Sequence, residues 1–371
     1  VYYDGQFDDA RMNIALVLTA VAEGATVANY LEVEALTKNG GRLAGATLRD
    51  KLSGQTLDVS ASVVINATGP FTDTIRQMDD PNATPMLSTS SGSHVVLDKR
   101  FSPPETGLLI PQTEDGRVLF LLPWLGHTLV GTTDHPAPLQ ANPKATEDDI
   151  EYILRHVRKY FSLPVERKDV LASWAGLRPL VSDPHAADTA KLSRDHVINI
   201  SPSGLLTIAG GKWTTYRKMA LDTVDHAIDL GGFTAGPSRT ESLVLVGGRN
   251  YSPAGTGALQ ERYGLDLDIA SYLNRAYGDC APVVAGMAVD GLGARLVAGQ
   301  PYLEAEVLYG ALHESARTIE DLLARRLRLS FLDHQGTLAA IPRVAELMAQ
   351  ALGWNVEKKA AAEERARAYF A

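Results

Sequence analysis

The sequence predicts an α/β fold that is followed by a domain made of helices alone. Strand-like and helix-like segments alternate up to about residue 245, and two of the strands run into glycine-rich turns. From residue 246 onward, apolar residues recur at helical spacing and glycines separate the segments. A chain of 371 residues is long enough for about two domains, which agrees with this division.

The overall composition narrows the classes of function. Hydrophobic residues make up 45% of the chain and charged residues 21%, as in folded globular proteins. The net charge of -9 argues against nucleic acid as a partner, so an anionic ligand would have to be bound by a local cluster of cations. The single cysteine, Cys280, excludes an internal disulfide framework, and no Cys or His spacing indicates a metal site.

Two further observations concern membranes and the start of the chain. No apolar run approaches the roughly 18 to 20 residues that cross a bilayer, so any membrane contact is expected to be peripheral. The chain begins with Val1, inside an expected strand or loop. We therefore expect the sequence to be a piece of a longer one.

Residues 1–90 are expected to form part of a parallel-sheet domain. Apolar and small residues at helical spacing predict a helix over 8–23. Short alternating strands over 26–64, broken by glycine turns, predict an antiparallel meander. The segment 63–70 is then expected to form a buried strand that ends at the Gly-Pro turn of 69–70, and a second helix starts at Thr72.

Residues 91–203 are expected to form mainly an antiparallel, substrate-binding sheet. Its predicted strands cover 93–97, 118–122 and 128–132, a segment near Trp174, and 196–200. Thr146 and Asp149 predict the cap of a helix that runs to about Phe161. The chain then returns to the first domain over 204–245, with a last strand ending at Gly210 and a helix over 214–228.

Residues 246–371 are expected to form a separate helical domain. The predicted helices cover 258–263, 302–314, 319–328, 338–352 and 356–370. Their charge-rich faces are most simply interpreted as solvated surface. The Gly-x-Gly sequences at 255–257 and 291–293 lack a third glycine and a preceding strand, so neither is interpreted as a dinucleotide-binding loop.

The most informative local pattern is an apolar strand that runs into Gly210, Gly211 and a helix with Lys212 in its first turn. Glycines let a ligand approach the backbone, and the free N–H groups at a helix start favour phosphate or a reduced flavin ring. The alternative is an ordinary strand-to-helix turn. Ala67, Thr68 and Gly69 form a second such turn, and the two together are typical of the carboxyl edge of a nucleotide-binding parallel sheet.

Two arginines are candidates for binding an anion. Arg178 lies where an expected strand meets Pro179, and its guanidinium can grip a phosphate or carboxylate through two hydrogen bonds. The alternative is a surface arginine without a ligand. Arg194 is the weaker candidate, because the adjacent Asp195 can neutralise it. Lys212 adds a point charge that can reach a substrate oxygen or a flavin carbonyl.

Two histidines compete for the role of a base. His94 lies on a short apolar strand, where a histidine is commonly a structural residue. A neutral imidazole there can also accept the hydroxyl proton of an alcohol that loses a hydride. His135, which follows Gly131-Thr132-Thr133-Asp134, is the competing candidate, and no Gly-x-Ser-x-Gly sequence indicates hydrolysis.

Several motifs in combination resemble the FAD-dependent glycerol-3-phosphate dehydrogenases, most closely the mitochondrial type. They are YYDGQFDDARMN at 2–13, INATGPFTD at 65–73, LPW at 122–124, GTTD at 131–134, LRPL at 177–180 and AGGKWTTYR at 209–217. EVLYGALHESARTIEDLLARRLRLSFLD at 306–333 is similar to the helical carboxy-terminal domain of that family. The resemblance therefore covers nearly the whole chain.

The resemblance implies a fold, a reaction and a site. The fold is an incomplete FAD-binding Rossmann-like sheet with an antiparallel substrate sheet and a carboxy-terminal all-helical domain. The reaction is oxidation of sn-glycerol 3-phosphate to dihydroxyacetone phosphate, with hydride passing to FAD and electrons passing on to quinone. The implied location is peripheral, at the mitochondrial inner membrane, or at the cytoplasmic membrane in a bacterium.

By matching motifs, the resemblance also implies roles for individual residues. Arg178, Arg194 and Lys212 would handle the substrate phosphate and the flavin edge, with His94 near the reacting carbon. The residues implied to line FAD are Ala67, Thr68, Gly69, Gly210, Gly211, Lys212, Thr214 and Thr215.

The chain departs from the family in lacking certain segments. The family's Gly-x-Gly-x-x-Gly unit and a substrate-site arginine would precede Val1, and no calcium-binding helix-loop-helix sequence occurs before Ala371. Two alternatives follow. One is a related flavin oxidase that acts on an amino acid or on glycerol phosphate with oxygen as the acceptor. The other is a truncated, non-catalytic interaction protein.

Overall fold

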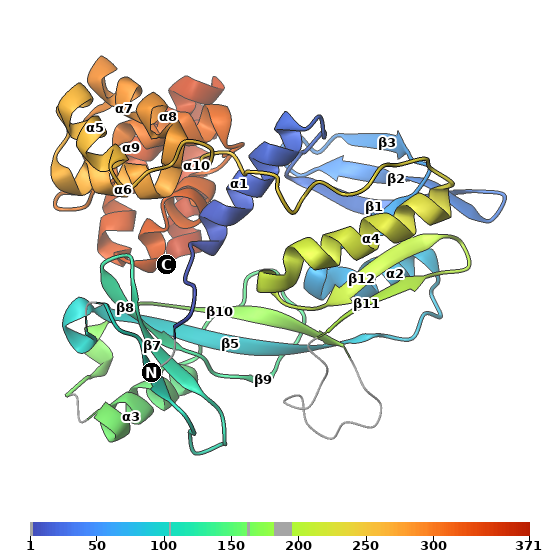
Figure 1. Ribbon diagram of the computed structural model, residues 1–371, viewed down its shortest axis with the longest axis horizontal. Coiled ribbons are helices and arrows are strands. Elements are labelled where there is room, and N and C mark those ends of the chain that lie inside the picture. Colours follow the sequence, from blue (N-terminus) through green and yellow to red (C-terminus); the bar gives the residue numbers. More distant parts are fainter. Residues whose placement is uncertain (1–2, 104, 162–163, 182–194) are drawn as a thin grey trace. The chain divides into compact units, whose positions relative to one another are not determined.

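The structure is a computed structural model that describes residues 3–103, 105–161, 164–181 and 195–371. The chain divides into two compact units (Figure 1). One unit consists of Ala28–Leu243, and the other combines Val1–Val27 with Val244–Ala371. The two are described separately.

The first sheet of the Ala28–Leu243 unit is the expected meander. Its strands are β1 (Leu31–Asn39), β2 (Arg42–Asp50) and β3 (Thr56–Ser60), and both pairings are antiparallel. The β1–β2 turn contains Gly40 and Gly41 with φ of 56° and 80°, a left-handed conformation that glycine adopts without steric cost. The prediction of a meander broken by a glycine turn is confirmed.

The largest sheet is antiparallel and has the order β10-β5-β8-β7-β6, with β9 beside β5. Its strands are β5 (Leu87–Asp98), β6 (Leu108–Ile110), β7 (Leu119–Trp124), β8 (His127–Gly131), β9 (His135–Pro136) and β10 (Val170–Val181). Strand β5 is longer than the predicted 93–97 because β10 pairs with it along its whole length, including the serine-rich segment that has no apolar alternation. Figure 1 shows β5 and β10 as two long neighbouring strands.

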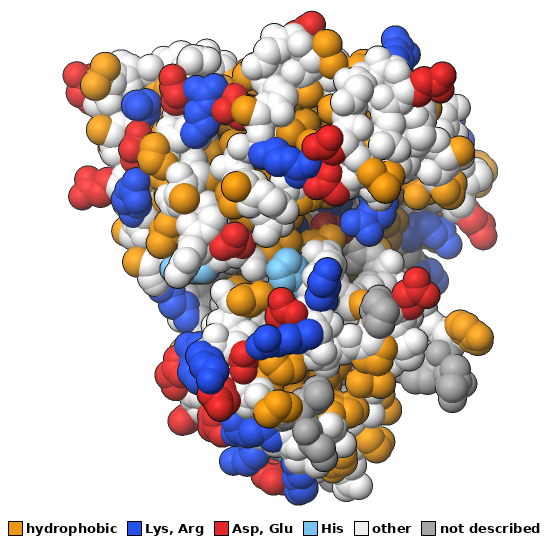
Figure 2. Space-filling view, turned by 90° about the vertical axis from the view of Figure 1, so that its left-hand side faces the viewer, with side chains coloured by type: hydrophobic (Ala, Val, Ile, Leu, Met, Phe, Trp, Pro, Cys, Tyr) orange, Lys and Arg blue, Asp and Glu red, His pale blue; other side chains and the backbone are white. Residues whose placement is uncertain are grey.

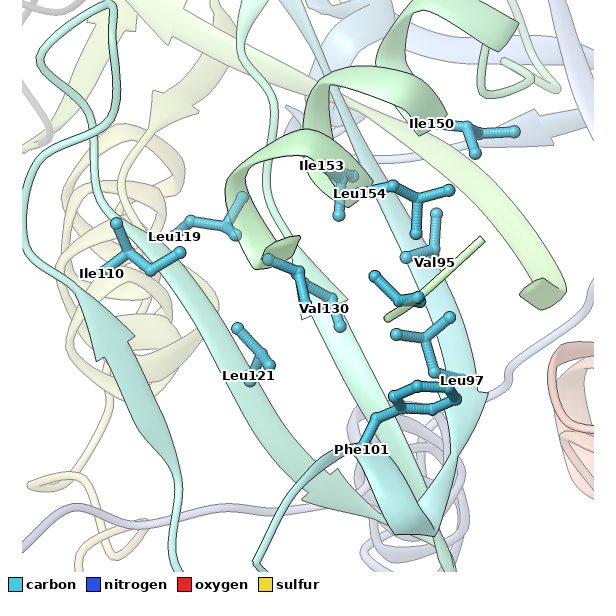
Figure 3. Packing of buried hydrophobic residues seen from close by; sticks show 12 residues of the cluster. Val95, Leu97, Phe101, Ile110, Leu119, Leu121, Val130, Ile150, Ile153 and Leu154 are labelled. Atoms are coloured by element: carbon cyan, nitrogen blue, oxygen red, sulfur yellow. The ribbon is translucent and has the colours of Figure 1, made fainter. Parts of the chain in front are cut away.

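One face of this sheet is covered by helix α3 (Glu147–Phe161). Ile150, Ile153 and Leu154 of the helix are buried against strand residues that include Val95 and Leu97 (Figure 3). The predicted cap is confirmed, because the Asp149 amide donates to the Thr146 hydroxyl and that hydroxyl donates to the Asp149 carboxylate. Since side chains alternate along a strand, Val95 and Leu97 point toward α3, whereas the alternate residues of β5, His94 among them, face away from it.

The third sheet contains the expected parallel strands. Its order is β11-β12-β4, where β11 is His196–Ile200, β12 is Leu205–Gly210 and β4 is Val64–Asn66. Strand β12 runs parallel to β4, with Thr207 opposite Asn66, and antiparallel to β11. Helices α2 (Thr72–Asp79) and α4 (Tyr216–Gly231) follow the two parallel strands and contact β12.

The second compact unit is helical. It contains α1 (Asp9–Ala22), α5 (Gly255–Tyr263), α6 (Leu267–Tyr277), α7 (Ala281–Met287), α8 (Glu304–His313), α9 (His334–Leu352) and α10 (Val356–Phe370). Helices α6 and α7 were not expected. The segment expected as a helix over 319–328 forms a π-helical turn at Asp321–Arg326.

Helix α1 groups with the carboxy-terminal helices, whereas the sequence places it in an amino-terminal domain over 1–90. The reason is a buried ion pair: the Arg11 guanidinium donates to both oxygens of Glu314, at 2.9 and 2.7 Å. The same guanidinium lies 4.3 Å from the centre of the Tyr277 ring. A bidentate pair combined with a cation–π contact is a strong anchor for a single helix.

Within the described residues, no helix is both long and apolar enough to cross a membrane.

Candidate active site

The face of the large sheet that points away from α3 brings together two residues predicted from the sequence. In the register of β5 and β10, His94 lies opposite Trp174, Gly92 opposite Gly176 and Ser90 opposite Arg178. Directly paired residues of antiparallel strands project their side chains to the same side. His94 and Arg178 therefore share this face, with Gly92 and Gly176 between them.

His94 is half-buried and packs between the ring of Trp174 and the backbone of Gly131. Its ring stacks on Trp174, with the ring centres 5.7 Å apart and the planes inclined by 14°, and Trp174 in turn contacts Trp124. On β8, a Cβ atom at Gly131 would come within 2.8 Å of the His94 Cγ atom. The absence of a side chain at Gly131 is thus what gives the imidazole its position.

Arg178 is built into the sheet face. Its guanidinium donates to the Thr132 hydroxyl at 3.0 Å and to the Thr133 carbonyl at 3.3 Å, and it lies 3.4 Å from the Asp134 carboxylate. A Cβ atom at Gly92 would fall 2.5 Å from its Nη1 atom. About a third of the side chain, 34%, remains exposed. The guanidinium is therefore oriented by the protein and still reaches the surface.

Asp134 connects this arginine to a wider network that the sequence alone did not reveal. Its carboxylate pairs with Arg117 as well as with Arg178, and it accepts a hydrogen bond from the Ser90 hydroxyl. Arg117 also pairs with Asp115 at 3.1 Å. The only sequence signal for Asp134 was its place in the Gly131–Asp134 motif.

His135, the competing candidate, points elsewhere. Its Nδ1 atom lies 3.4 Å from the carboxylate of Asp149, which belongs to α3 and also accepts from the Ser93 hydroxyl. Burial alone would raise the pKa of Asp149, but hydrogen bonds from Thr146 and Ser93 outweigh it and hold this pKa below its ordinary value. Because α3 covers the opposite face of the sheet, His135 is separated from His94 and Arg178.

The two glycine turns lie at the same edge of the third sheet, as the sequence predicts. Ala67, Thr68 and Gly69 follow β4, and Gly211 and Lys212 follow β12. Because β4 and β12 are parallel neighbours, their carboxyl ends lie at the same edge of the sheet. Gly69, Gly210 and Gly211 have φ of 58°, 75° and 76°. These left-handed conformations favour glycine at all three positions.

Lys212 is exposed, but it does not lie in the first turn of a helix as expected. The turned backbone of the glycine pair delays the helix, so Lys212 precedes the 3-10 turn η5 (Trp213–Thr215), and α4 begins only at Tyr216. Thr214 and Thr215 lie in η5, where the Thr215 hydroxyl donates to the Lys212 carbonyl at 3.0 Å. Backbone groups ahead of a helix remain available to a ligand in this arrangement.

Strand β10 links the glycine turns to the sheet face that carries Arg178. A Cβ atom at Gly210 would come within 2.7 Å of the side chain of Val181, the last residue of β10, and β10 also contacts the turn η1 (Gly69–Phe71). Arg178 lies three residues before Val181. Arg194, the weaker candidate, lies outside the described residues.

Charges of both signs are mixed on one face of the molecule. On the face shown in Figure 2, Lys and Arg side chains stand beside Asp and Glu side chains. The net charge of -9 likewise argues against a broad positive field on the protein. Among the residues that the structure describes, no group of three or more His, Cys, Asp or Glu side chains is arranged to hold a metal ion.

Most of the chain matches known families and relatives. Residues 1–217 match the family model described as "FAD dependent oxidoreductase", and residues 238–359 match the "C-terminal domain of alpha-glycerophosphate oxidase". The mitochondrial glycerol-3-phosphate dehydrogenase of Mus musculus is 51% identical over 97% of this chain and 51% of its own length. That of Homo sapiens is 50% identical over 100% of this chain and 53% of its own length.

A solved structure is similar over a larger share of its length. The glycerol-3-phosphate dehydrogenase from Bacillus halodurans, complexed with FAD, is 31% identical, with a TM-score of 0.85 over 98% of this chain and 73% of that one. The chain spans about half the length of the curated relatives it matches. From the matched family model, this solved structure and the shared fold, we conclude that the chain belongs to the FAD-dependent glycerol-3-phosphate dehydrogenase family.

Proposed function

We propose that the full-length protein carrying this sequence oxidises sn-glycerol 3-phosphate to dihydroxyacetone phosphate with FAD as the electron acceptor. The observation that carries the proposal is the placement of His94 and Arg178 on one face of a sheet whose strand β10 leads to the paired glycine turns. A base and an anion-binding group are the two side chains that oxidation of a phosphorylated alcohol requires.

The residues at the two glycine turns fit FAD. Gly69, Gly210 and Gly211 adopt left-handed conformations, a Cβ atom built at Gly69 would meet open space, and Thr68 and Lys212 beside these turns are exposed. The residues that would hold the cofactor are Ala67, Thr68, Gly69, Gly210, Gly211, Lys212, Thr214 and Thr215. Bound FAD would supply the chemistry of accepting a hydride.

Substrate binding is assigned to cationic side chains. The Arg178 guanidinium is planar and already oriented, so it can bind an oxygen-rich group through two hydrogen bonds at a low entropic cost. Lys212 would supply a point charge near the flavin edge, and Arg194 a further cation. Because the whole chain carries a net charge of -9, these residues would decide which anion is bound.

His94 is assigned the proton transfer. Oxidation of the substrate removes a hydride from C2 and a proton from the C2 hydroxyl, and the bond between C2 and this oxygen becomes a carbonyl. The imidazole of His94 accepts the proton, because its ring is fixed between Trp174 and Gly131 on the same face as Arg178. Histidine suits this role because its unperturbed pKa lies near neutral pH.

The electrons would pass on to quinone, at a peripheral site on the mitochondrial inner membrane, or on the cytoplasmic membrane in a bacterium. The proposal rests on the mitochondrial relatives, which are named for that compartment. An oxidase would instead consume oxygen and release peroxide. Quinone-dependent turnover without peroxide supports the dehydrogenase, and stoichiometric peroxide supports the oxidase.

The proposal is tested by expressing the full-length protein and measuring dye reduction with glycerol 3-phosphate and with glycerol. Loss of Arg178 in Arg178→Ala should lower kcat/KM more for glycerol 3-phosphate than for glycerol, by several-fold or more. Equal losses for both substrates would show that Arg178 is structural. A folded wild-type protein that binds FAD but does not reduce the dye would overturn the proposed reaction.

A further inference from the structure

Asp134, which follows strand β8, forms ion pairs with two arginines. Its carboxylate pairs with Arg117 and with Arg178, and the Ser90 hydroxyl donates to it from β5. These contacts join residues that are far apart in the sequence. Asp134 itself is largely enclosed, with 19% of its side chain exposed, so its contacts are shielded from water more than those of a surface pair.

The two residues before Asp134 are held in place by hydrogen bonds from strand β5 and from Arg178. The Thr133 hydroxyl accepts the Ser93 amide at 2.9 Å, while the Thr132 hydroxyl and Thr133 carbonyl accept from Arg178. Because Ser93 belongs to the central strand β5, the backbone next to Asp134 has a fixed register against the sheet. A carboxylate on such a segment has little freedom to follow the arginine if the arginine moves.

The charges in this cluster cancel. Arg117 and Arg178 contribute two positive charges, and Asp115 and Asp134 contribute two negative charges, which leaves a net charge of zero. If Asp134 influenced the site through charge alone, it would weaken the binding of an anion, and its removal would strengthen it. If Asp134 acts by orienting Arg178, its removal would weaken binding. The two roles predict effects of opposite sign.

We propose that Asp134 is a positioning residue, which holds the Arg178 guanidinium over Gly92 so that it meets the substrate in one orientation. Gly92 provides the space, since a Cβ atom there would fall 2.6 Å from the guanidinium carbon. Thr132 and Thr133 define the plane of the guanidinium, and Asp134 supplies a full negative charge beside it. An oriented guanidinium loses less entropy when it binds a phosphate or hydroxyl.

This inference rests on the proposed function for its kinetic test, which uses Asp134→Asn in the full-length enzyme. Asparagine keeps the shape of the side chain and raises the local charge by one. We expect kcat/KM for glycerol 3-phosphate to fall by about 10- to 100-fold, as for a misplaced binding group. Asp115→Asn is the matched control: it raises the charge beside Arg117 by the same amount, leaves the Arg178 contact intact, and should change kcat/KM less than threefold, as an effect on a partly exposed pair.

A double-mutant cycle with Arg178→Ala separates positioning from a general structural effect. If Asp134 acts through Arg178, Asp134→Asn should cause almost no further loss in the Arg178→Ala background. Equal losses in both backgrounds, or an increase of kcat/KM in Asp134→Asn, would overturn the proposal.

A direct structural readout keeps this inference separate from the proposed reaction. In crystal structures of the wild type and Asp134→Asn, the Arg178 guanidinium should leave the Thr132 hydroxyl in the variant. An unchanged guanidinium would overturn the positioning role, whatever the substrate is. Failure of the wild type to oxidise glycerol 3-phosphate would overturn the proposed function and leave this structural comparison valid.

Discussion

The guanidinium of Arg178 occupies the space that a side chain at Gly92 would need. An added Cβ atom at Gly92 would lie 2.5 Å from Nη1 and 2.6 Å from the guanidinium carbon. Gly176, which is paired with Gly92 on the neighbouring strand, faces open space, with no atom within 4 Å of an added Cβ. Two glycines that look alike in the sequence therefore have different roles.

Gly92→Ala should displace the Arg178 guanidinium and lower kcat/KM for glycerol 3-phosphate by about 100-fold, since a shift of about 1 Å in a binding group has effects of that size. Gly176→Ala should remain within about threefold of the wild type, because nothing crowds the new methyl group. Steady-state kinetics on both variants, with matched flavin content, provide the comparison. Equal activity of the two variants would show that the position of Arg178 over Gly92 does not matter for the reaction.

His94→Gln should lower kcat by about 100-fold or more, because general-base catalysis contributes on that scale. His135→Gln is the control, since His135 pairs with Asp149 on the side of the sheet covered by α3. We expect the control to keep most of the activity. A larger loss in His135→Gln than in His94→Gln would transfer the proton-accepting role to His135.

Asp79 should stabilise the Ala28–Leu243 unit above pH 4. Burial by itself would raise the pKa of Asp79, but hydrogen bonds from Lys38, Ser203 and Ser201 outweigh it and hold this pKa below its ordinary value of 3.8. A lowered folded pKa contributes stability that is present above pH 3.8 and lost as the pH falls through the folded value.

Asp79→Asn should therefore lower the free energy of unfolding by about 1 to 3 kcal/mol at neutral pH, the range expected when buried donors lose a charged partner. The difference from the wild type should shrink below pH 4. Asp58→Asn, on the exposed strand β3, should change stability by less than about 0.5 kcal/mol. Denaturant unfolding at several pH values measures both, and a pH-independent difference for Asp79→Asn would contradict the assignment.

Glu306 should give the free energy of unfolding of the helical unit the opposite pH dependence. Burial raises the pKa of Glu306 from 4.5 to about 7, although the Leu303 amide and the Tyr277 hydroxyl donate to its carboxylate. Between these two values the folded state binds more protons than the unfolded state. The free energy of unfolding should therefore decrease by about 3 kcal/mol as the pH rises from 4.5 to 7, and then level off.

In Glu306→Gln this slope should disappear, whereas Glu346→Gln, on the exposed side of α9, should keep it. Urea unfolding of each variant between pH 4.5 and 8 gives the slope. If Glu306→Gln retains the wild-type slope, another group is responsible for the proton uptake.

Much of the fold could be predicted because its signals are local. The meander, the cap of α3 and the glycine turns after β4 and β12 each depend on neighbouring residues, and the structure contains all of them. The unexpected helix α6 also carries a local signal, since Ile269, Leu273 and Tyr277 recur at helical spacing and are buried. The short strands β6 and β9 have no comparable pattern and depend on their partners in the sheet.

The site was harder to predict because its contacts join distant segments. Nothing near Asp134 in the sequence indicates that it pairs with Arg117 and Arg178, and only the register of β5 and β10 places Gly92 beneath the guanidinium. The register also separates His94 from His135, which the sequence left as alternatives. The types of residue in the sequence indicated which chemistry the site could carry out. Which side of the sheet each residue lies on could be known only from the fold.

We propose that this chain binds a phosphorylated alcohol on the sheet face that carries Arg178 and His94, next to bound FAD. The most direct measurement mixes the oxidised full-length enzyme anaerobically with glycerol 3-phosphate and follows bleaching of the flavin absorbance in a single turnover. We predict rapid bleaching in the wild type and bleaching slowed by about 100-fold or more in both Arg178→Ala and His94→Gln, with unchanged flavin content. Bleaching at the wild-type rate in both variants would contradict the account.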